Sequence, residues 1–362
     1  MFSSYCVYVC TFLIGVFSIR KYSNLSLGNK RNKFKECFFL MIAIIFPSIV
    51  AGVRYDVGID WDNYKLIYEY LTVGGTSTLE PGYILVLKIV KFFFRADYYF
   101  FNFVLSATLL SFVILAMLRI RTIEKTQMPI EMGYYIALVV TWGTSFNITR
   151  QCLASVIVLY AITFLFEKKW KYVFWVLVAS LFHLSAVFCL LFVFLTIKQR
   201  NKLYQKIYTV TIYFLIVLMC FMLQDVLEIF SRLGLYSGYF DSNTSKFSIG
   251  FMLYIIFPLG LVVLYAPKSL KDNLYYDLFL KLFVLQIPIQ FAGNLVNYAD
   301  RMAVYCNISS IILFPLVASK IKRKTIKRQF IMLSYVWFVI YFIVMWGILK
   351  MNGVFPYQTK WG

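Results

Sequence analysis

Apolar runs long enough to cross a bilayer recur along the whole chain, and short polar segments separate them. One α-helical crossing needs about 20 apolar residues, whereas a transmembrane barrel would show ten-residue segments of alternating polarity, and none are visible. The pattern therefore predicts an all-α fold, a polytopic bundle of transmembrane helices. The predicted crossings are residues 2–19, 37–53, 98–118, 131–142 with its neighbours, 152–166, a run ending near Leu223, 251–266, 278–296, 302–318 and a last run ending near Leu349. They give about ten crossings in one integral membrane domain that covers residues 1–362.

Two apolar stretches break the regular alternation between the two sides of the membrane. The stretch 80–95, "EPGYILVLKIVKFFFR", has a proline at its predicted helix start, and Lys88 and Lys91 interrupt it, so we interpret it as interfacial or re-entrant. The stretch between "EKKWK" and "KQRNK" is basic at both ends. Two half-length arms that turn back near His183 would keep both ends on one side. A single long tilted helix is the alternative.

Composition supports a membrane protein, and the placement of charge predicts its orientation. The chain is 61% hydrophobic and 14% charged, and its mean hydropathy is +0.76. The formal net charge is +20, and Lys and Arg gather in short clusters such as "RIRTIEK" and "KIKRKTIKR" between apolar runs. Such clusters are typical of cytoplasmic loops, so topology explains the charge and nucleic-acid binding is not expected.

The predicted topology places three arginines at the outer ends of helices: Arg54, Arg150 and Arg301. Arginine in this position is costly unless it is paired or hydrated, and its planar fork suits phosphate at a helix N-terminus. Each arginine could equally be an interfacial anchor or the partner of a nearby acid. An external phosphate ligand at membrane level would indicate a lipid-linked substrate.

The segment 54–80 is unusually acidic and aromatic, and we expect it to be external. Asp60, Asp62 and Tyr64 could bind the hydroxyls and faces of a sugar. A simpler interpretation is an amphipathic surface helix capped by Asp60 or Asp62. The chain shows no carboxylate cluster that requires a divalent metal and no nucleotide-sugar site, so we expect neither a metal nor a cofactor.

Four motifs, "AGVRYDVGIDWDNY", "EPGY", "NITRQCLA" and "FHLSA", follow one another in this order. They resemble the EpsG family of bacterial polysaccharide polymerases, which is similar to the Wzy O-antigen polymerases. The resemblance runs from about Ala51 to Ala186 and continues loosely through "ADRM" and "NGVFPY". It implies a GT-C-like, metal-independent, multi-pass enzyme of the bacterial cytoplasmic (inner) membrane. Its active site would lie on the outer side, where undecaprenyl-diphosphate-linked oligosaccharide units are polymerised.

The chemistry implied by this resemblance gives the candidate residues their roles. A sugar hydroxyl of one lipid-linked unit attacks the anomeric carbon of the growing chain and releases undecaprenyl diphosphate. Substrate binding and stabilisation of the leaving diphosphate would need cationic and polar side chains. The candidates for this role are Arg54, Arg150, Gln151, Arg301 and Tyr64.

The attacking hydroxyl also needs a base, and a histidine titrates in a suitable range. His183, the single histidine of the chain, is the first candidate. Asp60 and Glu80 are next. The alternative for His183 is a neutral imidazole that is hydrogen-bonded within the bundle.

Other functions of the same membrane class stay open at this point. An O-antigen ligase would use the same chemistry, and a flippase for lipid-linked oligosaccharides would use the same substrate. A flippase is expected to show duplicated halves and charged residues at the midplane, and neither is evident. The expected partners are the undecaprenyl-diphosphate-linked oligosaccharide, membrane lipid and a chain-length regulator.

Overall fold

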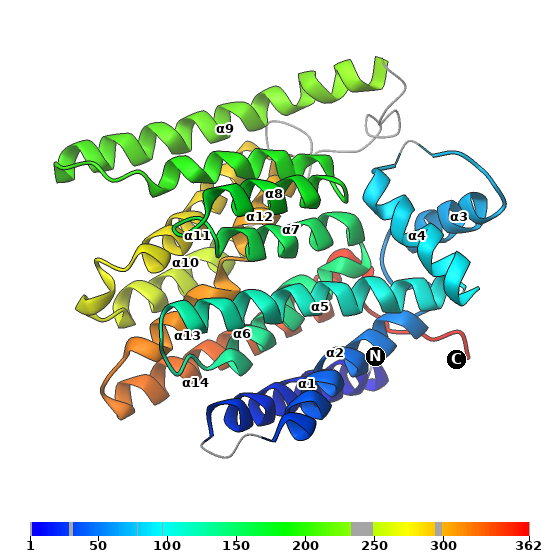
Figure 1. The fold of residues 1–362 in the computed structure, drawn as a ribbon, viewed down its shortest axis with the longest axis horizontal. Coiled ribbons are helices and arrows are strands. Elements are labelled where there is room, and N and C mark those ends of the chain that lie inside the picture. The colour runs from blue at the N-terminus through cyan, green and yellow to red at the C-terminus, as the bar shows by residue number, and fades with distance from the viewer. Residues whose placement is uncertain are drawn as a thin grey trace.

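The computed structural model describes residues 2–28, 32–77, 79–95, 97–232, 249–293 and 299–361. Figure 1 shows their arrangement as a bundle of helices that run back and forth along one axis. Within these residues the single β-type contact outside helices is an isolated antiparallel bridge between Arg54 and Thr359. The predicted all-α class is therefore confirmed.

Most of the predicted apolar runs form helices, several of them broken into shorter pieces. In chain order the elements are α1 (Phe2–Leu27), α2 (Lys33–Val53), α3 (Trp61–Thr72), α4 (Pro81–Phe94), α5 (Tyr98–Ile123), α6 (Ile130–Ala137), η1 (Leu138–Trp142), η2 (Thr144–Phe146), α7 (Thr149–Ile162), α8 (Lys169–Ser180), η3 (Leu184–Thr196), α9 (Lys202–Arg232), α10 (Ile249–Tyr265), η5 (Lys268–Leu270), α11 (Leu274–Ala292), η6 (Ala299–Ala303), α12 (Val304–Asn307), α13 (Ser310–Lys320), α14 (Lys324–Tyr341), η7 (Phe342–Ile348) and η8 (Met351–Gly353). The external loop expected from residue 224 onward begins later, because α9 continues to Arg232; the rest of that loop, residues 233–248, lies outside the described residues.

Six helical segments of the described chain are long and apolar enough to cross a membrane. These segments are Ser3–Leu27, Lys33–Val53, Tyr98–Ile123, Leu274–Ala292, Arg301–Lys320 and Lys324–Ile348. Shorter apolar helices, such as α7 with 14 residues, account for much of the difference from the expected ten crossings. The protein is thus a multi-pass membrane protein, while the count of about ten crossings is not confirmed.

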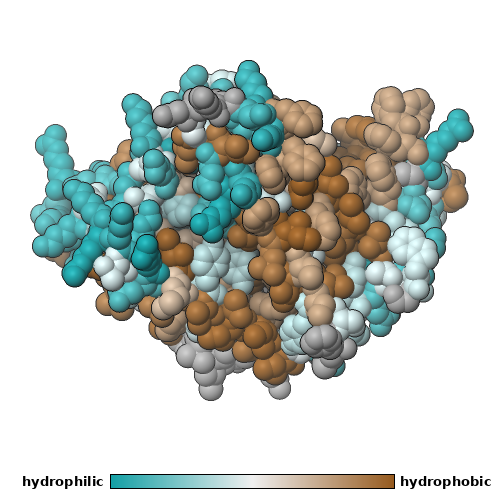
Figure 2. Space-filling model, turned by 90° about the horizontal axis from the view of Figure 1, so that it is seen from below, coloured by the Kyte–Doolittle hydropathy of each residue, from teal (hydrophilic) through white to brown (hydrophobic). Residues whose placement is uncertain are grey.

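The basic segments gather at one end of the bundle, which we call the basic end. Figure 1 shows the connections that follow α1, α5, α10 and α13 at the left, and Figure 2 shows hydrophilic residues gathered at that end, beside a hydrophobic middle. Glu124 fixes three of these connections together, since its carboxylate lies 2.8 Å from Lys320 Nζ and accepts from Asn273 Nδ2 at 2.8 Å. The opposite end carries α3, the start of α4 and the C-terminal residues (Figure 1).

The stretch around His183 turns back on itself, as one of the two interpretations predicted. The α-helix α8 ends at Ser180, and the 3₁₀-helix η3 begins at Leu184. The Tyr172 hydroxyl donates to the Cys189 carbonyl and so ties the two arms together. The arms are not equal half-lengths, however. The 12 residues of α8 extend about 18 Å, while the 13 residues of the more stretched η3 extend about 26 Å.

Helices α3 and α4 do not belong to the six candidate spans. The predicted start of α4 at Pro81 is confirmed, and its 14 residues extend about 21 Å, which is short for a crossing. Asp60 is the N-cap residue of α3, but its side chain makes no capping hydrogen bond. Helix α3 is amphipathic, because Trp61, Tyr64 and Tyr68 are buried on one face while Asp62 is exposed.

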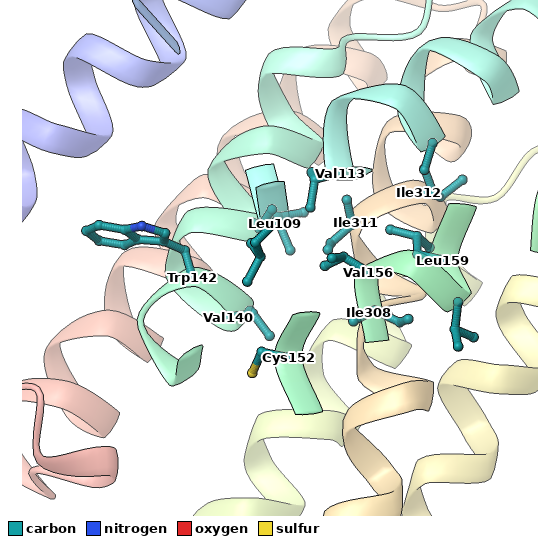
Figure 3. Packing of buried hydrophobic residues seen from close by; sticks show 14 of the residues in the cluster. Leu109, Val113, Val140, Trp142, Cys152, Val156, Leu159, Ile308, Ile311 and Ile312 are labelled. Carbon is teal, nitrogen blue, oxygen red and sulfur yellow. The ribbon is translucent and has the colours of Figure 1, made fainter. Parts of the chain in front are cut away.

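The core that supports the opposite end packs α5, η1 and α7 against α12 and α13. Figure 3 shows Leu109, Val140, Val156 and Ile311 converging there, and each is at most 4% exposed. This apolar packing holds the N-terminal ends of α7 and α12 side by side. Polar residues at those ends are therefore brought to one place.

Candidate active site

The "EPGY" segment is attached to the turn that carries His183. The Gly82 N–H donates to the Leu181 carbonyl at 2.8 Å, and a Cβ at Gly82 would lie 2.6 Å from that oxygen. Glycine is therefore required for this close approach. The neighbouring Glu80 carboxylate accepts from the Leu184 N–H at 3.3 Å through Oε1. The start of α4 and the start of η3 are thus held together.

Arg150 pairs with Glu80 across 70 residues of sequence. One guanidinium nitrogen of Arg150 contacts Glu80 Oε2, and the two side chains are only 10% and 5% exposed. The Arg150 guanidinium also lies 5.9 Å from the centre of the Tyr64 ring. Breaking a buried ion pair leaves an uncompensated charge, so this pair holds the first turn of α7 beside the start of α4. The expectation that such an arginine could partner an acid is met here, by Glu80.

His183 lies in extended backbone immediately before η3, with φ −157° and ψ 117°. Its Nδ1 is 2.6 Å from the Ser185 hydroxyl, and that hydroxyl is 3.0 Å from the hydroxyl of Tyr305. Tyr305 belongs to α12 and is completely buried. A line of three polar groups therefore leads from the turn into the core.

The electrostatic environment keeps His183 neutral. Its turn lies outside the six candidate spans. Burial lowers the pKa of His183 to about 4, because an imidazolium would lose its hydration. Glu80 raises the pKa, whereas Arg150 and Arg301 lower it. The histidine thus does not titrate near pH 7, which differs from the range expected from its unperturbed value.

Gln151 joins this cluster to the second half of the chain. Its side-chain Nε2 donates to the Arg301 carbonyl at 2.7 Å, and Gln151 is 2% exposed. The Arg301 side chain is partly exposed and close enough to His183 to repel a positive charge there. The "NITRQ" and "ADRM" segments, which are 150 residues apart, therefore meet at the same site.

Arg54 lies in a different environment, although it was expected to act with the other two arginines. Its guanidinium donates to the carbonyls of Ala51 and Val57 and to Asn102 Oδ1. It also lies 4.5 Å from the centre of the Phe146 ring, and the residue is 3% exposed. These contacts lock the end of α2 to the loop that follows it. The structure therefore places Arg54 within the fold and not beside Glu80 or His183.

The loop that carries Asp60 is held by the segment before α7 and by the C-terminal tail. The Asp60 N–H donates to Asn147 Oδ1 at 3.1 Å. Gly58 has φ +106° and donates its N–H to the Gly353 carbonyl at 2.9 Å. The Asp60 side chain is partly exposed.

Sequence reasoning missed two members of the cluster, Ser185 and Tyr305. Ser185 lies within the quoted "FHLSA" motif, two residues after His183, so its motif membership was a usable signal. Tyr305 follows Arg301 by one helical turn, but nothing local connects it with His183. Among the described residues, no group of three or more His, Cys, Asp or Glu side chains is placed to hold a metal ion.

The comparison with protein families agrees with the motifs in this cluster. The family model described as "EpsG family" matches residues 37–359, so the chain belongs to the EpsG family. The match extends well beyond the segment that carries the quoted motifs and includes η6, α12 and the C-terminal tail. No curated protein and no solved structure matches the chain. Membership of this family indicates a membrane protein of the polysaccharide-polymerase type.

Proposed function

We propose that this EpsG-family protein polymerises undecaprenyl-diphosphate-linked oligosaccharide units on the outer face of the bacterial cytoplasmic membrane. The observation that carries the proposal is the cluster of Glu80, Arg150, His183 and Arg301 at the end of the bundle opposite the basic end. Basic loops are normally cytoplasmic, so this cluster would face outward. Lipid-linked units that have been transferred across the membrane would be presented there.

The proposed reaction is a glycosyl transfer between two lipid-linked units. A hydroxyl oxygen of one unit forms a bond to the anomeric carbon of the growing chain. The bond between that carbon and the diphosphate oxygen breaks, and undecaprenyl diphosphate leaves with the electron pair. The leaving group is already stable as an anion, so the main need is for positive charge and hydrogen-bond donors around it.

Arg150 and Arg301 are the residues best placed to supply that charge. Both act electrostatically on His183, so both lie near the same turn. Glu80 offsets one of the two positive charges, so Glu80, Arg150 and Arg301 together carry a net positive charge, which suits a diphosphate. Gln151 positions the Arg301 backbone, and Tyr64 lies against Arg150. Tyr64 could then contact the first sugar.

The proton of the attacking hydroxyl passes to one of three groups: His183, Asp60 or Glu80. Nδ1 of His183 already contacts Ser185, so only Nε2 is left for the substrate. Whether Nε2 carries a proton decides between the histidine and the two carboxylates. Glu80 is already engaged by Arg150 and the Leu184 N–H, whereas Asp60 is more exposed.

A deletion experiment tests the function. Loss of the gene should leave single repeat units on the cell surface where the wild type shows a ladder of polymer on a gel, and the wild-type gene on a plasmid should restore the ladder. Complete polymer that accumulates on undecaprenyl diphosphate would indicate a ligase instead. Loss of all exported repeat units would indicate a flippase.

A substitution at His183 tests the site within the same assay. His183→Gln keeps a hydrogen-bonding side chain but removes the imidazole, and general acid–base catalysis typically contributes about 10²–10⁴-fold. We expect loss of the ladder at wild-type protein abundance. A normal ladder from His183→Gln would exclude His183 as the base, because an amide cannot accept a proton near pH 7. Purified protein with lipid-linked repeat units should show the same loss in rate.

A further inference from the structure

We propose that Ser185 and Tyr305 fix His183 in the tautomer that carries its proton on Nε2, so that the histidine faces the substrate as a hydrogen-bond donor. The inference rests on the proposed function only for the identity of the acceptor, a diphosphate oxygen. The direction of the hydrogen bonds within the protein stands on the geometry alone.

Tyr305, in α12, is 0% exposed. Its hydroxyl lies 3.0 Å from the Ser185 hydroxyl, which is its hydrogen-bond partner among the residues that the structure describes. A buried O–H group that finds no acceptor loses its hydration without compensation, while an oxygen with an unused lone pair loses much less. The Tyr305 hydroxyl therefore donates to Ser185.

The direction of the hydrogen bond at Tyr305 determines the direction of the hydrogen bond between Ser185 and His183. The Ser185 hydroxyl has one proton, and because it accepts from Tyr305 it is free to donate to His183 Nδ1, 2.6 Å away. The opposite direction would have Nδ1–H donate to Ser185 and Ser185 donate to Tyr305, leaving the Tyr305 proton buried without an acceptor. A neutral imidazole has one N–H group, so Nε2 carries the proton when Nδ1 accepts.

The charges around the turn are consistent with this tautomer. Arg150 and Arg301 both act on His183 as positive charges, and such surroundings suit an anionic ligand. An Nε2–H group pointing toward that ligand would donate to its oxygen, whereas a lone pair would repel it. The attacking hydroxyl would then give its proton to a carboxylate, Asp60 or Glu80, and His183 would hold the leaving diphosphate.

Because His183 is the single histidine, its tautomer can be measured directly in the whole protein. Protein grown with ring-¹⁵N histidine and placed in lipid nanodiscs gives nitrogen NMR signals from this residue alone, provided that no histidine tag is retained. We expect a protonated Nε2 and an unprotonated, hydrogen-bond-accepting Nδ1 at pH 7. A protonated Nδ1 with an unprotonated Nε2 would overturn the proposal, whether or not the protein polymerises anything.

Two variants test the role of the hydroxyl chain. Tyr305→Phe removes the donor that sets the direction, so Ser185 can accept from Nδ1–H and part of the ¹⁵N signal should move toward protonated Nδ1. Ser185→Ala removes the donor to Nδ1, so the Nδ1 signal should move to that of an unprotonated nitrogen without a hydrogen bond. Both variants should lower kcat more than they raise KM. Tyr275→Phe is the matched control, since it removes a buried hydroxyl that donates to the Thr163 carbonyl at 2.8 Å elsewhere in the bundle. It should leave both readouts unchanged.

The outcomes separate this inference from the proposed function. Unchanged ¹⁵N signals in Ser185→Ala would contradict the hydroxyl chain, and this variant also covers the case in which Tyr305→Phe does not fold. The expected tautomer in a protein that makes no polymer would uphold the hydrogen-bond direction and refute the polymerase. The NMR measurement needs no substrate, so the two results are independent.

Discussion

Arg54 and Arg150 lie at the same end of the bundle, and both are buried, at 3% and 8% exposure, yet their partners differ in kind. Arg54 donates to two carbonyls near it in sequence and to the Asn102 side chain, and its positive charge faces no carboxylate among these partners. Arg150 contacts the carboxylate of Glu80, which comes from a distant part of the chain and also accepts from the turn beside His183.

The partners of a buried arginine indicate whether it stabilises the fold or belongs to a site. The Arg54 guanidinium donates to carbonyls of residues 51–57 and to the Asn102 side chain, and it lies 4.5 Å from the centre of the Phe146 ring. It therefore stabilises local structure. The contact of Arg150 connects three segments, α7, α4 and the turn between α8 and η3. A substrate anion that competes for Arg150 would change the contacts of Glu80, and through them the position of His183.

The largest effect is expected from breaking the ion pair. Glu80→Gln leaves the Arg150 charge buried without its carboxylate, and such changes cost roughly 3–5 kcal/mol in the free energy of unfolding. We expect a large drop in the melting temperature in detergent and no polymer in cells. The double variant Glu80→Gln/Arg150→Met removes the buried charge, so it should recover much of the stability but none of the polymer. A normal ladder from the double variant would show that the pair is purely structural.

A smaller effect is expected from replacing each arginine by lysine, which keeps the charge but loses the planar fork. Arg54→Lys should lower the free energy of unfolding by about 1–3 kcal/mol, because buried acceptors lose their donors. Polymer made per folded molecule should stay normal. Arg150→Lys and Arg301→Lys should lose most of the polymer at normal abundance. Equal loss of activity from Arg54→Lys would show that Arg54 is needed for the reaction and not only for stability.

The smallest effect is expected from replacing Gly82 by alanine. Gly260→Ala is the control, and it should change the free energy of unfolding in the opposite direction. Gly82→Ala places a Cβ against the Leu181 carbonyl, so α4 must move away from the His183 turn, and both stability and polymer yield should fall. Gly260→Ala lies inside α10 with no atom within 4 Å of the added carbon. It should raise the free energy of unfolding by about 0.5–1 kcal/mol, as expected for Gly to Ala within a helix. A neutral Gly82→Ala would mean that the "EPGY" contact does not position the site.

Apolar run length and charge placement along the chain specify the class of the molecule and the segments that form its site. A membrane protein must satisfy its backbone within helices, so apolar run length and basic clusters were enough to predict an all-α bundle with its polar motifs at one end. The turn near His183 was also predictable, because basic residues at both ends of one apolar stretch favour a return. The start of α4 at Pro81 followed from local helix chemistry.

Which polar groups meet depends on how the helices pack against one another. The contact between Glu80 and Arg150, the hydroxyl chain from His183 to Tyr305 and the enclosure of Arg54 join residues up to 120 positions apart. The stretched 3₁₀ form of η3 and the break between α12 and α13 are likewise not visible in an apolar run. Hydrophobic pattern determines that a helix is buried, but it does not determine which neighbours it packs against. Those neighbours decide whether a buried charge is paired with a carboxylate or with carbonyl oxygens, and this pairing separates Arg150 from Arg54.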